Sequence, residues 1–147
     1  MSDTRKARAI GLNHIALEVG DIDAALAFYG RFLDFTLRSR GETMAFIDLG
    51  DQFIALAKTD SRTTDAHRHI GLVVDDQEAA LDALDRAGIE RQRNRVLDPW
   101  GNRLEIVGYP TIQFTKTDHV LRAMNLGHLE KTDDAKNQLT AKGMAPD

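Results

Sequence analysis

The stretch His14–Asp21, with the sequence HIALEVGD, recurs as His69–Asp76, with the sequence HIGLVVDD. The likeness continues without a gap, because each copy is followed at the same distances by Ala-Ala-Leu and then by an arginine. An internal repeat of this kind indicates a fold composed of two equivalent supersecondary units. The histidine that opens both copies suggests a site where the two units meet.

The composition of the 147-residue chain, 42% hydrophobic and 29% charged, is that of one globular domain with a substantial core. A net charge of −4 without a basic block gives no reason to expect binding to nucleic acid or to an anionic membrane surface. The absence of cysteine excludes disulfides, thiolate metal ligands and a cysteine nucleophile. No apolar run approaches the roughly 20 residues of a membrane span, and the polar residues 2–8 do not resemble a secretory signal. A cytoplasmic protein is therefore expected.

Alternation and helical spacing predict the elements of the first unit. Apolar and mixed residues alternate over 14–19, which predicts a strand with one face on a hydrophobic layer. Asp21 is typical of a helix N-cap, and apolar residues then recur at helical spacing as far as Leu33. Residues 44–49 and 53–57, separated by a Gly-Asp turn, are expected to form a hairpin.

The second unit repeats this plan. A strand is expected over 70–74, followed by a helix that is capped by Asp76 and stopped by Gly88. The sequence Asp-Pro-Trp-Gly at 98–101 has its residues where a type I turn favours them, and 103–107 is the expected closing strand. Each unit is therefore β-α-β-β, with a further strand optional.

The remainder of the chain, residues 110–147, lies outside the repeat and is predicted to be a helical extension. Two short helices are expected in it, over 119–126 and 133–142. His119 lies on the first of them. It is a candidate general base if the extension folds over a site, although a surface position is the ordinary interpretation.

Three side chains of the repeat form a candidate metal site. When the turns before the two closing strands are aligned, Ala55 and Glu105 take equivalent positions. His14, His69 and Glu105 have the parity opposite to the apolar residues of their strands, so all three would point into a cavity that curving strands enclose. Two imidazoles and one carboxylate form the facial triad of non-haem iron and related sites, which leaves coordination positions open. Fe(II) or Mn is expected first, with Ni, Co or Zn as alternatives.

Each of these residues also has an ordinary structural interpretation. The histidines could be half-buried strand residues bonded to the backbone, and Glu105 a solvated carboxylate. Their equivalence in the repeat, together with the carboxylate that completes the set, favours the metal. Arg103 shares the parity of Glu105 and is a candidate catalytic residue that could contact an anionic substrate group, or it could extend to solvent.

The chain resembles the vicinal oxygen chelate superfamily, which includes glyoxalase I, extradiol dioxygenases, fosfomycin-resistance enzymes and bleomycin-binding proteins. The resemblance covers roughly residues 10–109, with modules at about 12–58 and 67–108. It implies a single α+β domain of two βαβββ modules whose sheets curve around a metal, either within one chain or by exchange between the subunits of a homodimer. It also implies the ligands His14, His69 and Glu105. The matching signatures are His14–Leu17, Ala25–Tyr29, His69–Val74 and Asp98–Glu105.

Departures from the family pattern narrow the function. Ala55 stands where glyoxalase I and the epimerases have a fourth ligand, which weakens a glyoxalase reading. The three-ligand pattern is similar to that of extradiol dioxygenases and fosfomycin thiol-transferases. However, residues 90–96 do not resemble the cation loop and phosphonate pocket of the transferases. The additional histidine and tyrosine of the extradiol enzymes are not found at the expected distance either.

The first functional hypothesis is a divalent-metal-dependent enzyme of the dioxygenase type, acting on a small substrate that chelates the metal through adjacent oxygens. A lyase, isomerase or thiol-transferase with the same metal site is the alternative among enzymes. A metal-free drug-binding module of the bleomycin-resistance kind is the alternative outside enzymes, and the intact ligand triad weighs against it.

Overall fold

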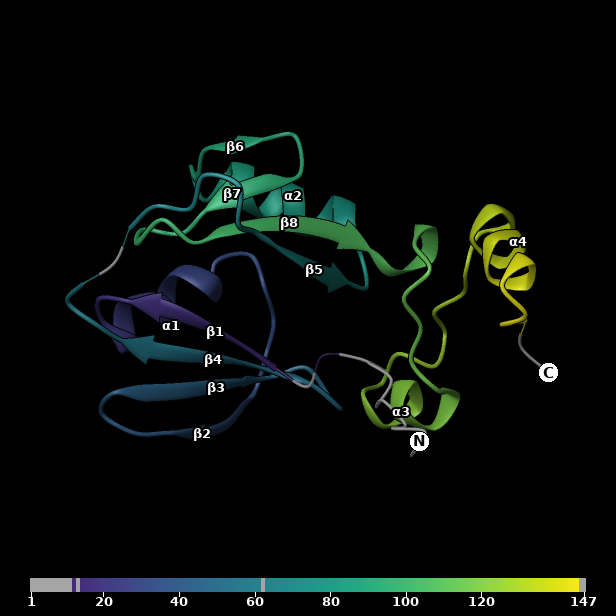
Figure 1. Ribbon diagram of the computed structural model, residues 1–147, viewed down its shortest axis with the longest axis horizontal. Coiled ribbons are helices and arrows are strands. Elements are labelled where there is room, and N and C mark those ends of the chain that lie inside the picture. The colour runs from purple at the N-terminus through teal and green to yellow at the C-terminus, as the bar shows by residue number, and fades with distance from the viewer. Residues whose placement is uncertain (1–11, 13, 62, 146–147) are drawn as a thin grey trace, which may run out of the picture.

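The computed structural model describes residues 12, 14–61 and 63–145, and it contains two four-stranded sheets (Figure 1). The predicted start of the domain at residue 10 lies outside the described residues. In the first module the strands lie in the order β1-β4-β3-β2. Its elements are β1 (His14–Val19), α1 (Ile22–Tyr29), β2 (Leu37–Arg40), β3 (Met44–Asp48) and β4 (Phe53–Lys58).

The second module has the same plan, with its strands in the order β5-β8-β7-β6. The two βαβββ modules and the α+β class are therefore confirmed. The elements of this module are β5 (Ile70–Val74), α2 (Gln77–Arg86), β6 (Arg91–Gln92), β7 (Arg95–Leu97) and β8 (Arg103–Gly108).

The strand register is the same in both modules. β1 pairs with β4 in parallel, and Ala55 lies opposite the second residue after His14. β5 pairs with β8 in parallel, and Glu105 lies opposite the second residue after His69. Ala55 and Glu105 thus occupy equivalent positions, as the alignment of the closing strands predicts.

Side-chain caps start both helices where the sequence predicts them. Asp21 accepts a hydrogen bond of 2.7 Å from the amide of Ala24, and Asp76 accepts one of 3.0 Å from the amide of Ala79. These bonds satisfy amides that have no partner within the helix. At the other end of α2, Gly88 has a φ of +70° and stops the helix as expected.

The structure differs from the prediction in one helix end and in the short strands. α1 ends at Tyr29, because the chain turns at Gly30, and Leu33 packs against the core from the following loop. The residue pattern does not locate β2, the further strand that the family resemblance implies, since all four of its residues are exposed and show no alternation. β6 and β7 comprise only two and three residues, which is too short for a periodic signal.

A buried polar contact joins the two modules. The hydroxyl of Tyr29 on α1 donates a 2.8 Å hydrogen bond to Asp98, which lies in the predicted turn of the second module. Asp98 also accepts from the amides of Trp100 and Asn102, and the side chain of Asn102 donates to the carbonyl of Glu18 on β1. Burial, reinforced by the charge of Asp98, raises the pKa of Tyr29 far above its usual value, so the hydroxyl remains a donor.

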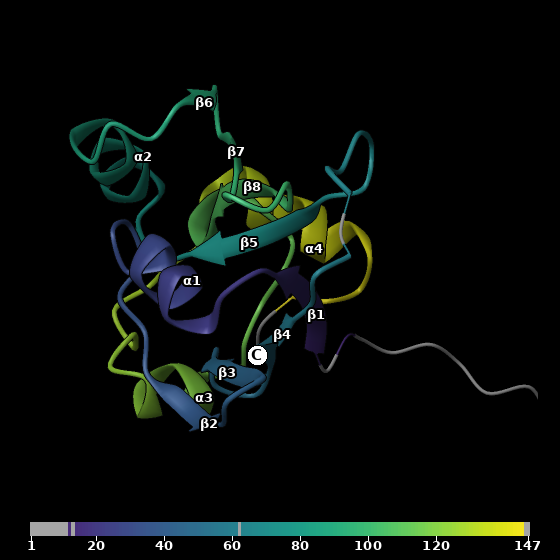
Figure 2. The same cartoon turned by 90° about the vertical axis from the view of Figure 1, so that its left-hand side faces the viewer.

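The hydrophobic core also extends across both modules, with α1 between the first sheet and the second module (Figure 2). Its buried members come from the apolar parity of the strands and from the inner faces of the helices, as expected. They include Leu17, Val19, Tyr29, Leu72, Leu84, Leu104 and Ile106.

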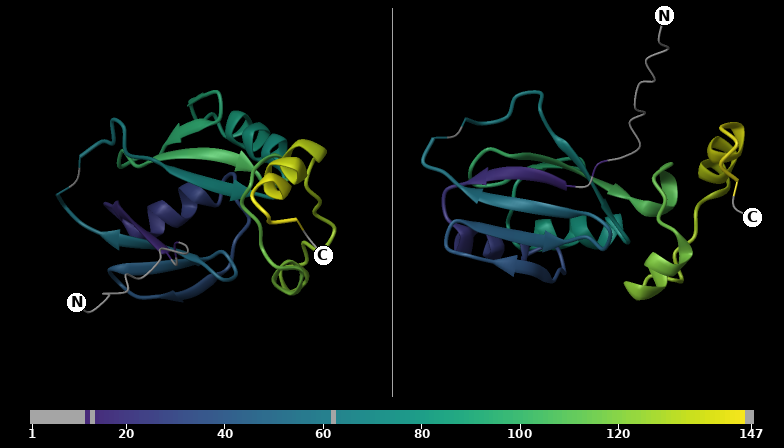
Figure 3. Two further views of the ribbon diagram at one scale, coloured as in Figure 1. Left: turned by 45° about the vertical axis from the view of Figure 1, so that its right-hand side comes forward. Right: turned by 60° about the horizontal axis from the view of Figure 1, so that its bottom comes forward.

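The C-terminal extension lies beyond β8, at one end of the two sheets (Figure 3). It contains a 3-10 turn, η1 (Tyr109–Thr111), and the helices α3 (Asp118–Ala123) and α4 (Asp133–Ala141). The two predicted helices are therefore present and slightly shorter than expected. Among the described residues, no helix has the length and apolar character needed to cross a membrane.

Lys131 connects the residues that follow α3 with the residues that precede it. Its ammonium group donates to the carbonyls of Tyr109 and Ile112, at 2.5 and 2.9 Å, and to that of Phe114. The same nitrogen lies 3.6 Å from the centroid of the Tyr109 ring. Burial lowers the pKa of Lys131 to about 8.

Candidate metal centre

His69 and Glu105 meet on the second module. His69 immediately precedes β5, Glu105 lies in β8, and the two strands are hydrogen-bonded neighbours. The imidazole Nε2 lies 3.6 Å from the carboxylate Oε2. Both side chains keep access to solvent, with 44% and 28% of their surfaces exposed, so a ligand can reach them.

The backbone sets the state of the His69 ring. Its Nδ1 lies 2.9 Å from the carbonyl oxygen of His67. A carbonyl only accepts, so Nδ1 donates the hydrogen, and in the neutral ring Nε2 has its lone pair on the side of Glu105. Metal-binding histidines are oriented in this way, with the second nitrogen donating to a carbonyl or carboxylate. His67 thus orients His69 through its backbone carbonyl, while its own side chain is exposed.

Two further polar groups surround the Glu105 carboxylate. The amide nitrogen of Asn94 lies 3.4 Å from Oε1, and Nε of Arg95 lies 4.0 Å from Oε2. Arg95 is the register partner of Glu105 on β7, which explains why the two side chains share a face. Neither residue is a candidate from the sequence, because their contact with Glu105 depends on the position of a three-residue strand.

The donor pair fits a divalent metal. Atoms 3.6 Å apart can both lie about 2.1 Å from one ion, the usual length of a bond from zinc to nitrogen or oxygen. The Nε2 of His69 and the carboxylate of Glu105 supply one nitrogen and one oxygen donor. In the described part of one chain, however, no group of three histidine, aspartate or glutamate side chains is close enough to hold a metal. The predicted triad therefore does not converge within a single chain.

His14 lies on the other module, in an aromatic setting. Its ring stacks on Phe53 of β4, with centroids 4.6 Å apart and an interplanar angle of 8°. Phe46 of β3 meets Phe53 edge-on at 5.6 Å, and the guanidinium of Arg38 lies 4.7 Å from the centroid of the same ring. The three rings form what we call the aromatic wall: His14, Phe46 and Phe53.

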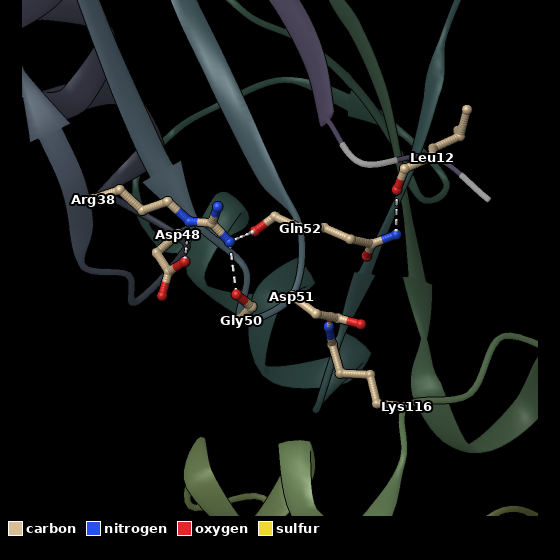
Figure 4. Close-up of polar contacts among 7 residues, drawn as sticks. All are labelled: Leu12, Arg38, Asp48, Gly50, Asp51, Gln52 and Lys116. Carbon is tan, nitrogen blue, oxygen red and sulfur yellow. Dashed lines mark hydrogen bonds and ion pairs between the residues drawn. The ribbon is translucent and has the colours of Figure 1, made fainter.

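Three hydrogen bonds hold the guanidinium of Arg38 at the turn between β3 and β4 (Figure 4). Its Nε donates 2.6 Å to Asp48, and its Nη2 donates to the carbonyls of Gly50 and Gln52 at 2.6 and 2.9 Å. Arg38 thereby fixes the turn between β3 and β4, and its role there is structural.

Arg103 and His119, the candidate catalytic residues of the sequence, form no hydrogen bond or ion pair with His69 or Glu105 among the described residues. Arg103 binds the segment between the modules: its Nη2 donates 3.2 Å to the carbonyl of Asp65, and its backbone amide donates 3.3 Å to the Asp65 carboxylate. The Nε of Arg103 is buried and has no hydrogen-bond partner among the described residues. His119 is exposed on α3, in the C-terminal extension.

A family model matches residues 11–121, and its description is Glyoxalase/Bleomycin resistance protein/Dioxygenase superfamily. The chain belongs to this superfamily. The match spans both modules and reaches α3, so it includes His14, His69 and Glu105.

A curated protein is similar to about two thirds of the chain. The glutathione transferase FosA of Serratia marcescens is 26% identical in an alignment of 110 positions that covers 65% of this chain and 78% of the transferase.

Solved structures of the superfamily share the fold. The fosfomycin resistance protein FosX from Listeria monocytogenes has a TM-score of 0.57 at 18% identity, covering 69% of this chain and 94% of FosX. A glyoxalase/bleomycin resistance protein/dioxygenase from Alicyclobacillus acidocaldarius has a TM-score of 0.53 at 21% identity, covering 67% of this chain and 91% of that protein. These likenesses confirm the superfamily fold.

Proposed function

We propose that this protein is a divalent-metal-dependent enzyme whose metal centre forms between two copies of the chain. His69 and Glu105 of one copy supply two ligands, and His14 of the other copy supplies the third. One observation carries the proposal: the His69 Nε2 and the Glu105 Oε2 are 3.6 Å apart, with the His69 ring already fixed by a carbonyl.

The position of His14 supports a centre between subunits. It is exposed on β1, and β1 stands at the edge of the first sheet just as β5 stands at the edge of the second. A two-fold dimer that brings these edges together would create two identical centres, because each contact of such an interface occurs twice.

The ligand set suits Fe(II) or Mn first, with Ni, Co or Zn as alternatives. When bound, such an ion supplies a Lewis acid with open positions for two adjacent substrate oxygens. The chain's own residues have distinct tasks. The carbonyl of His67 orients His69, and Asn94 holds the Glu105 carboxylate. Arg95, only 4.0 Å from Glu105 and half-exposed, is placed to bind an anionic group of the substrate.

Transfer of a thiol to a small anionic substrate is the reaction that these features support best. Arg95 adds positive charge next to the ligands, the three-ligand set fits a thiol-transferase, and a relative of the chain is named as a glutathione transferase. Ring cleavage by a dioxygenase, the first hypothesis from the sequence, becomes the second candidate. The aromatic wall favours it, since flat aromatic rings stack well on such a surface.

Mixing two inactive variants tests the centre between subunits. His14→Ala and Glu105→Ala should each lose stoichiometric Mn(II), measured by mass spectrometry after dialysis. When the two variants are unfolded and refolded together, half of the dimers become mixed, and each mixed dimer has one intact centre. Metal should return to about one quarter of the sites. Refolding each variant alone is the control, and no recovery in the mixture would contradict the proposal.

Two assays separate the candidate reactions. A thiol-transferase consumes glutathione in the presence of fosfomycin or another small anionic electrophile, whereas a dioxygenase takes up oxygen in the presence of a catechol and Fe(II). In either assay, Arg95→Gln should raise the KM for an anionic substrate about tenfold and leave the metal content unchanged. An unchanged KM would remove Arg95 from the substrate site.

A further inference from the structure

A cavity of about 620 Å³ lies between the two modules and the C-terminal extension. This volume is in the range of about 300–1,000 Å³ that is typical of small-molecule sites. Its walls are mainly aliphatic and aromatic side chains. Those from the strands include Ile15, Ile54, Ile70 and Leu72, and those from the extension include Phe114 and Leu121. Apolar walls of this extent favour a ligand that removes them from water.

The cavity is separate from the His69–Glu105 pair. Neither of these residues lines it. Ile15, Ile70 and Leu72 belong to the apolar parity of their strands, whereas His14 and Glu105 belong to the opposite parity. His14 and Phe53 contribute to the lining at the start of β1 and β4, so the cavity adjoins the aromatic wall, whereas the His69–Glu105 pair of the same chain lies outside it.

The extension closes the cavity through two contacts with the turn between β3 and β4. The ammonium of Lys116 forms an ion pair with Asp51, and this contact lowers the pKa of Asp51 (Figure 4). Met124 packs against Gly50, where its sulfur would lie 2.6 Å from any added Cβ. These contacts hold one wall of the cavity in place.

The charges around the cavity favour a cation. Four carboxylates line it: Asp34, Asp48, Asp75 and Asp76. Lys116 is the one lysine or arginine among the described residues of the lining, and Asp51 already pairs with it. Arg38 forms an ion pair with Asp48. Asp76 caps α2 and Asp75 accepts a hydrogen bond from the amide of Asp76, but neither of these two cations pairs with them or with Asp34. A carboxylate ligand would be repelled, whereas an ammonium group would be attracted.

We propose that this cavity is a binding site for a small aromatic or aliphatic amine, whose apolar body lies between the modules and whose ammonium group faces the carboxylates. The site does not rest on the proposed metal chemistry, since it uses neither His69 nor Glu105, and His14 only borders it.

Three matched probes test the site by titration calorimetry at neutral pH: 1-naphthylmethylamine, 1-methylnaphthalene and 1-naphthoate. We expect the amine to bind at least about tenfold more tightly than the naphthoate, with the neutral compound between them. Asp34→Asn should reduce the preference for the amine, whereas Asp60→Asn, an exposed control outside the lining, should not. Equal affinity for amine and acid would overturn the charge assignment.

Filling the cavity tests its position. Ala79 is exposed on α2 and lines the cavity, so Ala79→Trp should weaken amine binding at least about tenfold. Ala87→Trp, at the other end of the same helix and outside the lining, is the control. Glu105→Gln should leave the affinity unchanged. A loss caused by Glu105→Gln and not by Ala79→Trp would place the probe at the metal centre and overturn the proposal.

A second copy of the chain is the competing occupant of the cavity. In that case none of the three probes binds, and Ala79→Trp converts dimer to monomer in analytical ultracentrifugation. Either result would overturn the proposed amine site.

Discussion

Gly101 has a left-handed backbone and no room for a side chain. Its φ is +85°, and a Cβ built on it would lie 2.5 Å from the Cα of Thr64. The glycine therefore allows the segment between the modules to pass directly over the turn that contains Asp98. Both the backbone and the close contact require glycine at this position.

Gly101→Ala should lower the free energy of unfolding by about 2–4 kcal/mol, because the backbone is strained and Thr64 has to move. Gly41→Ala is the matched control, since nothing lies within 4 Å of the added Cβ and its φ is not in the left-handed region. It should be neutral or slightly stabilising. Urea denaturation measures both, and equal effects of the two substitutions would contradict this account.

At the level of single residues, the sequence identifies His69 and Glu105 but not what surrounds them. Their spacing in the repeat predicts that they face the same way, and the structure brings them together. The tautomer of His69 depends on the position of the His67 carbonyl, and the contact of Arg95 depends on register. Such contacts between neighbouring strands leave no periodic signal in the sequence.

At the level of elements, strands with alternating residues were predictable and exposed strands were not. β1, β3, β4, β5 and β8 carry alternation or an apolar run, whereas β2 has four exposed residues in succession. The helices were predictable because capping aspartates mark where α1 and α2 begin. The two helices of the C-terminal extension could be predicted, but the contacts that attach the extension to the modules could not. Lys131 binds backbone carbonyls, and such contacts have no sequence signature.

The extension should respond to pH through Lys131. Burial lowers the pKa of Lys131 to about 8 in the folded protein, against 10.5 for an ordinary lysine. Between these values the unfolded chain holds a proton that the folded protein has released. Stability contributed by this group therefore rises as the pH increases from about 8 toward 10.5, and it is constant below this window.

Lys131→Met should remove this rise. The difference in melting temperature between the wild type and Lys131→Met, followed from pH 7 to pH 10, isolates the contribution of Lys131 from other titrations. Lys136→Met, on the exposed side of α4, is the control and should follow the wild type. A difference that does not change with pH would show that Lys131 keeps its ordinary pKa in the folded state.

At the level of the whole molecule, the repeat predicts two modules but not which modules pair. The same sequence pattern is compatible with a metal centre within one chain and with a centre shared by two chains. In the described part of one chain, His14 does not form a three-ligand group with His69 and Glu105. A centre made of all three ligands within one chain is therefore not present in this structure.

A centre shared between subunits links metal binding to dimerisation. Metal that binds only the dimer should shift the monomer–dimer equilibrium toward the dimer, by an amount that grows with the metal concentration. Sedimentation with and without Mn(II) measures the shift, and Glu105→Gln should abolish it while leaving metal-free association unchanged. If Mn(II) binds stoichiometrically without changing the association constant, the centre is not shared.

The equivalence of Ala55 and Glu105 has an electrostatic consequence for the proposed centre. A dication held by two neutral imidazoles and one carboxylate is left with positive charge that an acidic residue at position 55 would have cancelled. Such an ion would attract substrates that bring their own oxyanion. Because position 55 is alanine, the remaining positive charge of the metal would be neutralised by an anionic group of the bound substrate.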